Sequence, residues 1–159
     1  MNKDKIILSE MDANFKNEIA SQPGAEHFKQ CFTCGTCTAS CPVAEVHDDY
    51  DPRKIIRMSI LGMKEEVLSS DLLWMCSRCY TCYALCPQGV KFTDVIGVLR
   101  DMAIKQGYAL KEQDMQTREL DKFVQDLRCQ LIDQKLHPKE SNKKKINNMI
   151  NKELNKKWK

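Results

Sequence analysis

The chain has 159 residues, of which 42% are hydrophobic and 30% charged, with a net charge of +3. This length favours one domain, and no apolar run approaches the roughly 20 residues that cross a bilayer. The start of the chain lacks the apolar stretch of a secretory signal. Residues 139–159 carry eight lysines and two glutamates, whereas residues 1–138 have a net charge of −3. We therefore expect a cytoplasmic protein with no transmembrane segment and no nucleic-acid partner.

Residues 1–30 predict an N-terminal extension that contains a short helix. Residues 6–8 are apolar and predict a short extended start. Asp12 is the expected cap of the helix, and Phe15 and Ile19 follow at the spacing of one buried helix face.

Residues 31–109 predict a helical core. Asp51 followed by Pro52 favours a helix start, because an aspartate side chain accepts hydrogen bonds from the first turn and proline fits the first helical position. Gly62 is the expected end or bend of this helix.

Two more helices are expected in the same core. Ser70 or Asp71 caps a short helix, and Thr93 or Asp94 caps a helix of roughly three turns that stops near Gly107. Strand-like alternation is almost absent from the chain, so the predicted fold class is mostly α.

The remaining residues predict two helical segments. Residues 110–138 read as a C-terminal helix that ends before Pro138. Residues 139–159 form a basic tail with an apolar stripe, which is either a solvated face or a partner-docking helix.

The most informative feature is a repeated cysteine pattern. Residues 31–42 read CFTCGTCTASCP and residues 76–87 read CSRCYTCYALCP, each element displaced by 45 positions. Each block precedes a loop and an apolar helix, which indicates an internal duplication. The eight cysteines are Cys31, Cys34, Cys37, Cys41, Cys76, Cys79, Cys82 and Cys86.

The spacing C-x2-C-x2-C-x3-C-P is the bacterial signature for [4Fe–4S] ligation. Three cysteines at intervals of three residues let one tight loop reach three iron corners. In two-cluster ferredoxins the fourth cysteine ligates the other cluster. We therefore expect two [4Fe–4S] clusters, although each fourth cysteine closing its own cluster is the open alternative. The expected ligands are Cys31, Cys34, Cys37 and Cys86 for the first cluster, and Cys76, Cys79, Cys82 and Cys41 for the second.

Zinc and disulfides are the competing interpretations of these cysteines. Zinc sites generally use two separated cysteine pairs, which two triplets with trailing Cys-Pro fit badly. Disulfides are rare in a reducing cytoplasm. Cys129 stands alone, and a lone helical cysteine is usually a small buried hydrophobe. Four aromatic side chains flank the second block and are expected to shield a cluster from water: Trp74, Tyr80, Tyr83 and Phe92.

The sequence resembles the C subunit of heterodisulfide reductase, an α-helical two-[4Fe–4S] ferredoxin family. The resemblance is carried by CFTCGTCTASCPV, by DPRKIIRM and above all by CSRCYTCYALCPQGVKFTDVI. It covers roughly residues 10–125, and the tail lies outside it.

The resemblance implies an oxidoreductase subunit that relays electrons through its two clusters. The implied partners are a flavoprotein like the A subunit of such complexes, and a catalytic, disulfide-reducing chain like their B subunit. No catalytic residue or substrate site is expected on this chain itself. An iron–sulfur subunit of a membrane-associated respiratory complex and a free diffusible ferredoxin are the alternatives.

Overall fold

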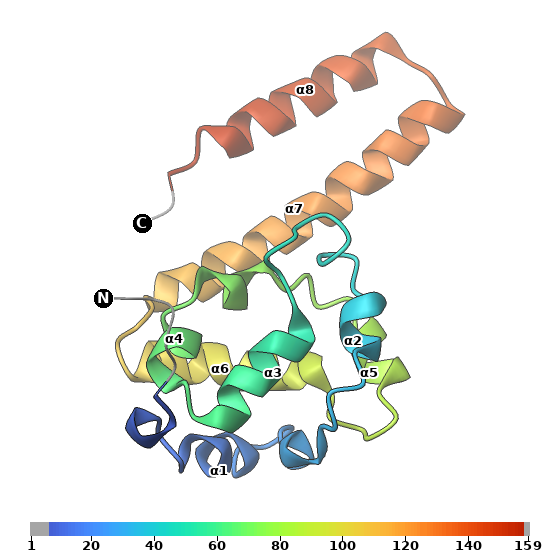
Figure 1. Ribbon diagram of the computed structural model, residues 1–159. Helices are drawn as coiled ribbons and strands as arrows, with labels where there is room; N and C mark the ends of the chain where they lie inside the picture. The colour runs from blue at the N-terminus through green and yellow to red at the C-terminus, as the bar shows by residue number, and fades with distance from the viewer. Residues whose placement is uncertain (1–6, 158–159) are drawn as a thin grey trace. The chain divides into compact units, whose positions relative to one another are not determined.

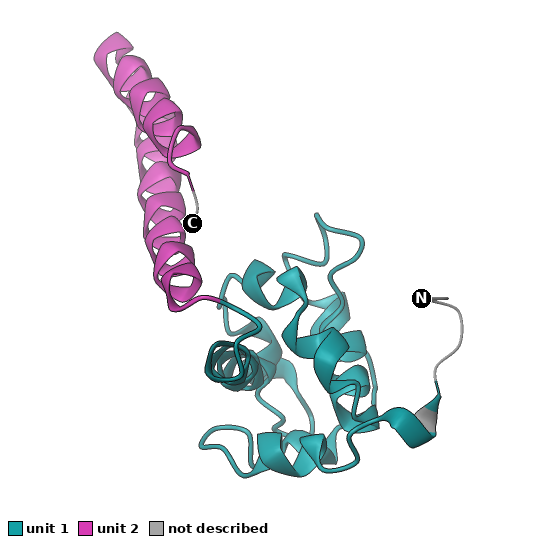
Figure 2. Ribbon diagram, turned by 90° about the vertical axis from the view of Figure 1, so that its left-hand side faces the viewer, with its two compact units in different colours: residues 1–109 teal, residues 110–159 magenta. Residues whose placement is uncertain are grey.

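The computed structural model describes residues 7–157, and every regular element in that part of the chain is a helix. The mostly α fold class is thus confirmed. The chain divides into two compact units, Met1–Ala109 and Leu110–Lys159, which Figure 2 draws in teal and magenta. The first unit carries all eight block cysteines, so its construction positions the site.

The first unit contains short 3-10 helices (η) and α-helices, arranged around α3 and α6 (Figure 1). In chain order they are η1 (Leu8–Glu10), α1 (Phe15–Ala20), η2 (Phe28–Gln30), α2 (Thr36–Ala39), α3 (Pro52–Leu61), α4 (Lys64–Leu68), η3 (Asp71–Met75), α5 (Thr81–Leu85) and α6 (Phe92–Lys105).

The sequence duplication appears in space as a repeated series of elements. In each half a 3-10 helix leads into the cysteine loop, a short helix follows it, and a longer helix comes after a connecting segment. The short helices α2 and α5 pack against each other, α2 also contacts α3, and α5 contacts α6 (Figure 1). The two cysteine blocks are therefore side by side, although they lie 45 residues apart in sequence.

Helix α3 has the predicted ends. The Asp51 side chain accepts a hydrogen bond from the backbone N–H of Lys54 at 3.1 Å, and Pro52 occupies the first turn. Gly62 follows the last turn in the left-handed conformation, with φ of 84°.

Helix α6 begins differently from the prediction. Neither Thr93 nor Asp94 caps it; the residue before its first turn is Lys91, which has a φ of 56° and makes no side-chain capping bond. Thr93 is instead buried, and its hydroxyl lies 3.2 Å from the Cys82 sulfur. Of the two caps proposed for the short helix before the second block, Ser70 is the one used, since its hydroxyl accepts from Leu72 N–H at 3.2 Å.

The N-terminal segment contributes to the core of the first unit. Phe15 and Ile19 of α1 are fully buried, as the helical spacing predicted. The predicted extended start is wrong at Leu8, which begins a 3-10 helix, while residue 6 lies outside the described residues. Lys64 of α4 pairs with Glu18 of α1 at 2.8 Å.

The hydrophobic core of the first unit centres on α6. Burial of apolar side chains is the main stabilising contribution to such a fold. The fully buried side chains of α6 are Val95, Ile96, Leu99 and Ala103, and Arg100 is buried among them with 1% exposure.

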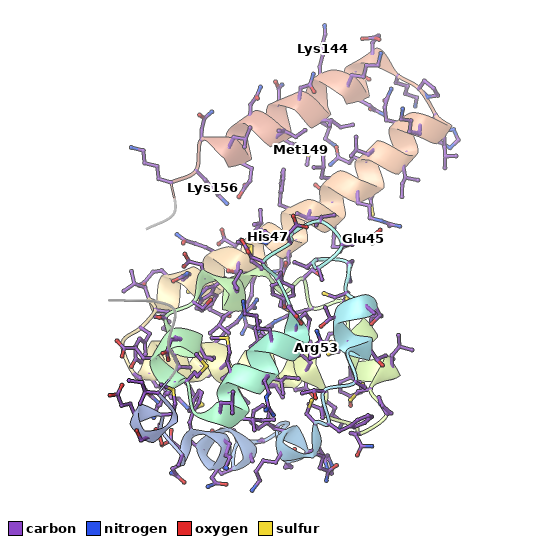
Figure 3. All side chains as sticks on the ribbon, in the orientation of Figure 1. Glu45, His47, Arg53, Lys144, Met149 and Lys156 are labelled. Atoms are coloured by element: carbon purple, nitrogen blue, oxygen red, sulfur yellow. The ribbon has the colours of Figure 1, made fainter. Side chains whose placement is uncertain are left out.

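The second unit is a pair of helices, α7 (Lys111–Leu136) and α8 (Glu140–Leu154), joined at the predicted His137-Pro138 break. Ile146 is buried, and Lys156 pairs with Glu119 at 3.2 Å. Figure 3 shows Met149 on the side of α8 that faces α7, and Lys144 pointing away from it.

Two residues of the second unit, Cys129 and Trp158, were also the subject of sequence predictions. Cys129 is exposed on α7, so the expectation that it is buried was wrong. Trp158 of the predicted tail stripe lies outside the described residues.

Within residues 7–157, the structure has no helix with the length and apolar character needed to span a bilayer.

Alanine substitutions at two glycines test the close approach of Asp12, in the segment before α1, to the end of α3. A Cβ added at Gly62 collides with the carbonyl group of Asp12, whereas one added at Gly107 meets nothing within 4 Å. Both residues have positive φ, so alanine costs about 1–2 kcal/mol at either site from backbone strain. We expect Gly62→Ala to lower the free energy of unfolding, measured by urea, by about 2 kcal/mol more than Gly107→Ala. Equal losses would contradict the close approach.

Candidate metal centre

The two cysteine loops have the same backbone conformation. Cys31 has φ and ψ of −63° and 115°, and Cys76 has −62° and 117°. Two residues of each loop then adopt positive φ, separated by one residue. They are Thr33 (59°) and Gly35 (86°) in the first loop, and Arg78 (52°) and Tyr80 (60°) in the second.

Left-handed residues alternating with others turn backbone N–H groups toward one concave side, an arrangement that binds anions. Glycine adopts this conformation without strain, but a residue as bulky as Tyr80 does so only where the surrounding structure imposes it. The repeated strain therefore marks the loops as a functional feature. It also explains why three cysteines three residues apart can share one side of a loop.

The middle cysteine of each loop is hydrogen-bonded to a threonine two residues later. The sulfur of Cys34 lies 3.3 Å from the Thr36 hydroxyl, and that of Cys79 lies 3.4 Å from the Thr81 hydroxyl. Hydrogen bonds from Thr36 lower the pKa of Cys34. Burial raises the pKa of Cys79, but hydrogen bonds with Thr81, Ser77 and its own backbone together outweigh it, and the net pKa is lowered. Both exposed thiols are therefore biased toward the thiolate, the form that binds metals.

The third cysteine of each loop is in the opposite environment. Burial raises the pKa of Cys37 to about 11, and the charges of Cys31 and Cys82 act in the same direction. Burial also raises the pKa of Cys82, against its hydrogen bond with Thr93. Thiolates at these positions need a nearby positive charge, which iron ions supply.

A cavity beside the first loop collects cysteines from both blocks. Cys31, Cys34 and Cys37 line it together with Cys86 and Cys82 of the second block. The cavity wall also includes Ile56 of α3, Phe92 of α6 and the side chain of Arg53. Figure 3 shows Arg53 at the start of α3.

Cys41 does not line this cavity; it lies in a separate hollow formed by residues 38–45 of its own segment and by one residue of the second block. That residue is Thr81, and the charge of Cys41, like that of Cys76, acts on the hydroxyl of Tyr50. Cys86 thus shares a cavity with the first loop, and Cys41 shares a hollow with Thr81. Cys76 and Cys79 do not line the first cavity.

Hydrogen bonds connect the first loop to α3. The Thr38 hydroxyl donates to the Asp51 carboxylate at 2.6 Å and accepts from the backbone N–H of Arg53 at 3.1 Å. Because Asp51 also caps α3, one side chain holds both the helix start and the turn after the loop.

The donor set fits a multi-iron group better than a single ion. In residues 7–157 no three His, Cys, Asp or Glu side chains converge closely enough to hold one metal ion. A structural zinc site needs four donors around one point, whereas a [4Fe–4S] cluster takes its four thiolates at separate corners. The eight cysteines of the two blocks, five of which line the first cavity, suit the second arrangement.

Several residues at this site were missing from the sequence predictions. Arg100, buried in α6, donates a hydrogen bond to the carbonyl of Cys76 at 3.1 Å, and Tyr50, 1% exposed, belongs to the same buried cluster as Cys76. No spacing rule links them to the cysteine block. Of the predicted aromatic shields, Phe92 lines the first cavity, whereas Tyr80 and Tyr83 are 51% and 38% exposed.

Comparison with known proteins agrees with this chemistry. A family model described as a 4Fe-4S dicluster domain matches residues 27–90, and such a domain holds two [4Fe–4S] clusters. The iron–sulfur C subunit of the CoB–CoM heterodisulfide reductase of Methanopyrus kandleri is 48% identical over 121 residues, covering 71% of this chain and 62% of that protein.

Two further relatives are 40% and 41% identical to this chain over the aligned residues. The C 2 iron–sulfur subunit of the CoB–CoM heterodisulfide reductase of Methanocaldococcus jannaschii is 40% identical over 109 residues, covering 64% of this chain and 58% of that protein. The C subunit of the H(2):CoB-CoM heterodisulfide,ferredoxin reductase of Methanothermobacter marburgensis is 41% identical over 103 residues, covering 65% and 55%. The chain spans less than two thirds of the length of these curated relatives.

Substitution at Tyr80 tests the loop conformation. A β-branched residue tolerates the left-handed conformation poorly, while asparagine tolerates it well. We expect Tyr80→Val to lower the free energy of unfolding by about 1–2 kcal/mol more than Tyr80→Asn, and to reduce iron and sulfide content after anaerobic reconstitution. Tyr83→Val, on the neighbouring helix, is the control and should retain its iron. Equal iron in all three variants would show that the loop does not depend on this conformation.

Proposed function

Over the region that its relatives share, this chain belongs to the family of heterodisulfide reductase iron–sulfur C subunits, and from that premise we propose that it is the electron-transfer subunit of a cytoplasmic heterodisulfide-reductase-like complex. It relays electrons between a flavoprotein chain, like the A subunit of such complexes, and a disulfide-reducing chain, like their B subunit. The observation that carries the proposal is the packing of α2 on α5, which sets the two cysteine blocks side by side in one unit.

The chain's own residues perform three tasks in this proposal. The cysteines bind the two clusters, each of which takes up and releases one electron at a time. The left-handed loops direct N–H groups toward negative charge, and the core helices keep the two loops at a fixed separation. The reduction of a disulfide belongs to a partner, and no catalytic residue is assigned to this chain.

We also propose the crossed ligand sets for the two clusters. Cys31, Cys34, Cys37 and Cys86 hold the first cluster, and Cys76, Cys79, Cys82 and Cys41 hold the second. The position of Cys86 on the first cavity and that of Cys41 beside Thr81 support this assignment. Crossing makes each cluster depend on both halves of the duplication, so the two loops cannot separate while both clusters are bound.

The relay is tested by anaerobic affinity purification of the chain from its native host, followed by identification of the proteins retained. We expect a flavoprotein and a second cysteine-rich chain. The chain with chemically reduced clusters, mixed with that cysteine-rich partner and its disulfide, should then regain the visible absorbance of oxidised clusters.

Other results would contradict the relay in distinguishable ways. A membrane-bound haem or quinone protein in place of the flavoprotein would replace the proposal with the respiratory alternative. Recovery of the chain alone, with clusters that reduce many unrelated acceptors, would indicate a diffusible ferredoxin.

Alanine substitutions test the crossed ligand sets without prior assignment of either cluster. Each single variant should lose about half of its iron, since one of two clusters is lost. With crossed ligation, Cys86→Ala leaves the same residual EPR spectrum as Cys34→Ala, and Cys41→Ala the same as Cys79→Ala. If instead Cys86→Ala leaves the spectrum of Cys79→Ala, and Cys41→Ala that of Cys34→Ala, each block closes its own cluster. Cys129→Ala is the control and should retain all its iron.

A further inference from the structure

The outer side of α3 carries a group of basic side chains that has no role in the relay described so far. Arg53, Lys54 and Arg57 are all exposed. Their spacing of one, three and four residues places them on one side of the helix. The buried side of the helix is formed by Pro52, Ile55, Ile56 and Ser59. A charged helix face is often only solvated, so a function for it has to be argued from its surroundings.

The three basic side chains belong to an open hollow, which we call the basic hollow. The residues that line it are Thr33, Asp51, Arg53, Lys54, Arg57, Met58, Leu61 and Met63. Cations therefore share this surface with aliphatic and thioether groups. Arginine and methionine are both enriched where proteins contact each other, and methionine adapts its shape to a partner. The composition suits a protein partner better than a nucleic acid, whose binding sites are more polar.

The positive charge of the basic hollow is only partly compensated. Three cations face a single carboxylate, that of Asp51, which lies 4.0 Å from the Arg53 guanidinium. Among residues 7–157, neither Lys54 nor Arg57 has a carboxylate oxygen within 4.0 Å. Lys54 also borders a neighbouring pocket that contains two further carboxylates, those of Asp49 and Glu66. The basic hollow thus has an excess of positive charge that carboxylates of another molecule would balance.

The basic hollow adjoins the cavity that collects the cysteines of the first loop. Thr33 and Arg53 line both. A Cβ added at Gly35 would lie 3.5 Å from a terminal nitrogen of Arg53, so the guanidinium lies beside the first loop. Cys34, which stands between Thr33 and Gly35, is exposed. A protein bound in the basic hollow would therefore lie next to the exposed edge of the first ligand loop.

The second loop offers a different surface. The exposed large hydrophobic side chains of residues 75–85 are Met75, Tyr80, Tyr83 and Leu85, whereas residues 31–42 have only Phe32. The cations beside the second loop, Arg78 and Lys91, are half-buried, and Lys91 lies over the ring of Tyr83, 5.0 Å from its centre. An exposed basic surface therefore accompanies the first loop and is not repeated at the second.

We propose that the basic hollow docks the carboxylate-rich surface of the redox protein that exchanges electrons with the first cluster. This inference rests on the proposed two-cluster relay, and it adds the place and the chemistry of one contact. Opposite charges guide the encounter of two proteins and fix their orientation. The step that follows docking is the transfer of one electron. The donor is oxidised and the acceptor reduced by one electron, no bond forms or breaks, and no proton moves.

Two small redox proteins of opposite surface charge test the proposal, namely plant plastocyanin, which is acidic, and mitochondrial cytochrome c, which is basic. The reconstituted full chain is reduced, freed of reductant and mixed with each in a stopped-flow instrument. We expect Lys54→Gln together with Arg57→Gln, the α3 pair, to slow the reduction of plastocyanin about tenfold at low ionic strength. High salt should remove this difference, because it screens the charges. The reduction of cytochrome c should not slow.

Binding is measured separately from electron transfer. No electron passes from copper(I) plastocyanin to the oxidised chain, so isothermal titration calorimetry of that mixture reports association alone. The α3 pair should raise the dissociation constant about tenfold at low ionic strength. It should keep the iron and sulfide content of the unaltered chain, because neither Lys54 nor Arg57 lines the cysteine cavity.

Two controls separate the basic hollow from the rest of the chain. Lys144→Gln together with Lys145→Gln, the α8 pair, removes the same charge from exposed positions of the basic tail, and both rates and the dissociation constant should stay unchanged. Cys34→Ala removes the first cluster whether or not the ligand sets cross. In that background the α3 pair should no longer affect the rate of plastocyanin reduction.

Several results would overturn the proposal. An unchanged rate and affinity for plastocyanin in the α3 pair would do so, as would an equal effect of the α8 pair, which would assign the attraction to net charge. Equal slowing with plastocyanin and cytochrome c would mean that the substitutions change the cluster and not the docking. An effect that persists in Cys34→Ala would place electron exit at the second cluster.

The outcome can be interpreted whichever partners the chain has. If the α3 pair does not fold, Arg57→Gln alone decides, because it leaves Lys54 in place. The experiments use the chain and purified probe proteins, so they do not require the proposed flavoprotein or disulfide-reducing chain. The expected loss of rate and affinity in a chain that retains no flavoprotein would uphold the inference and contradict only the proposed partners.

Discussion

The left-handed backbone of the cysteine loops is the constraint on which the rest of the first unit depends. Three cysteines at intervals of three residues share one concave side only if the chain reverses its local twist, which it does at positions 33 and 35 and again at 78 and 80. In the second loop this conformation falls on arginine and tyrosine, so local preference does not produce it. The surrounding helices must hold it in place.

The helices meet that requirement through contacts that begin directly after the loops. Helix α2 packs on α5, and each contacts the longer helix of its own half. Thr38 and Asp51 connect the first loop to the start of α3, and Thr93 of α6 reaches Cys82. Duplication therefore produces two equivalent loops, and the packing of α2 on α5 makes them neighbours. A two-cluster relay follows naturally from this arrangement.

The duplicated backbone does not carry duplicated electrostatics. The first loop faces an exposed arginine paired with a carboxylate, whereas the second is backed by the buried side chains of Tyr50 and Arg100. The duplication therefore repeats the backbone of the loop but not the side chains that surround it.

The sequence by itself determined the features that depend on local chemistry. The cysteine spacing indicated two [4Fe–4S] clusters, and Asp51, Pro52 and Gly62 marked the ends of α3, since capping involves only neighbouring residues. Tertiary structure alone decided the left-handed conformation of Tyr80, the start of α6 after Lys91, the burial of Thr93 and the hydrogen bond from Arg100 to the carbonyl of Cys76. These features arise between segments distant in sequence, and no local periodicity encodes them, because burial and hydrogen bonding across the fold override local preference.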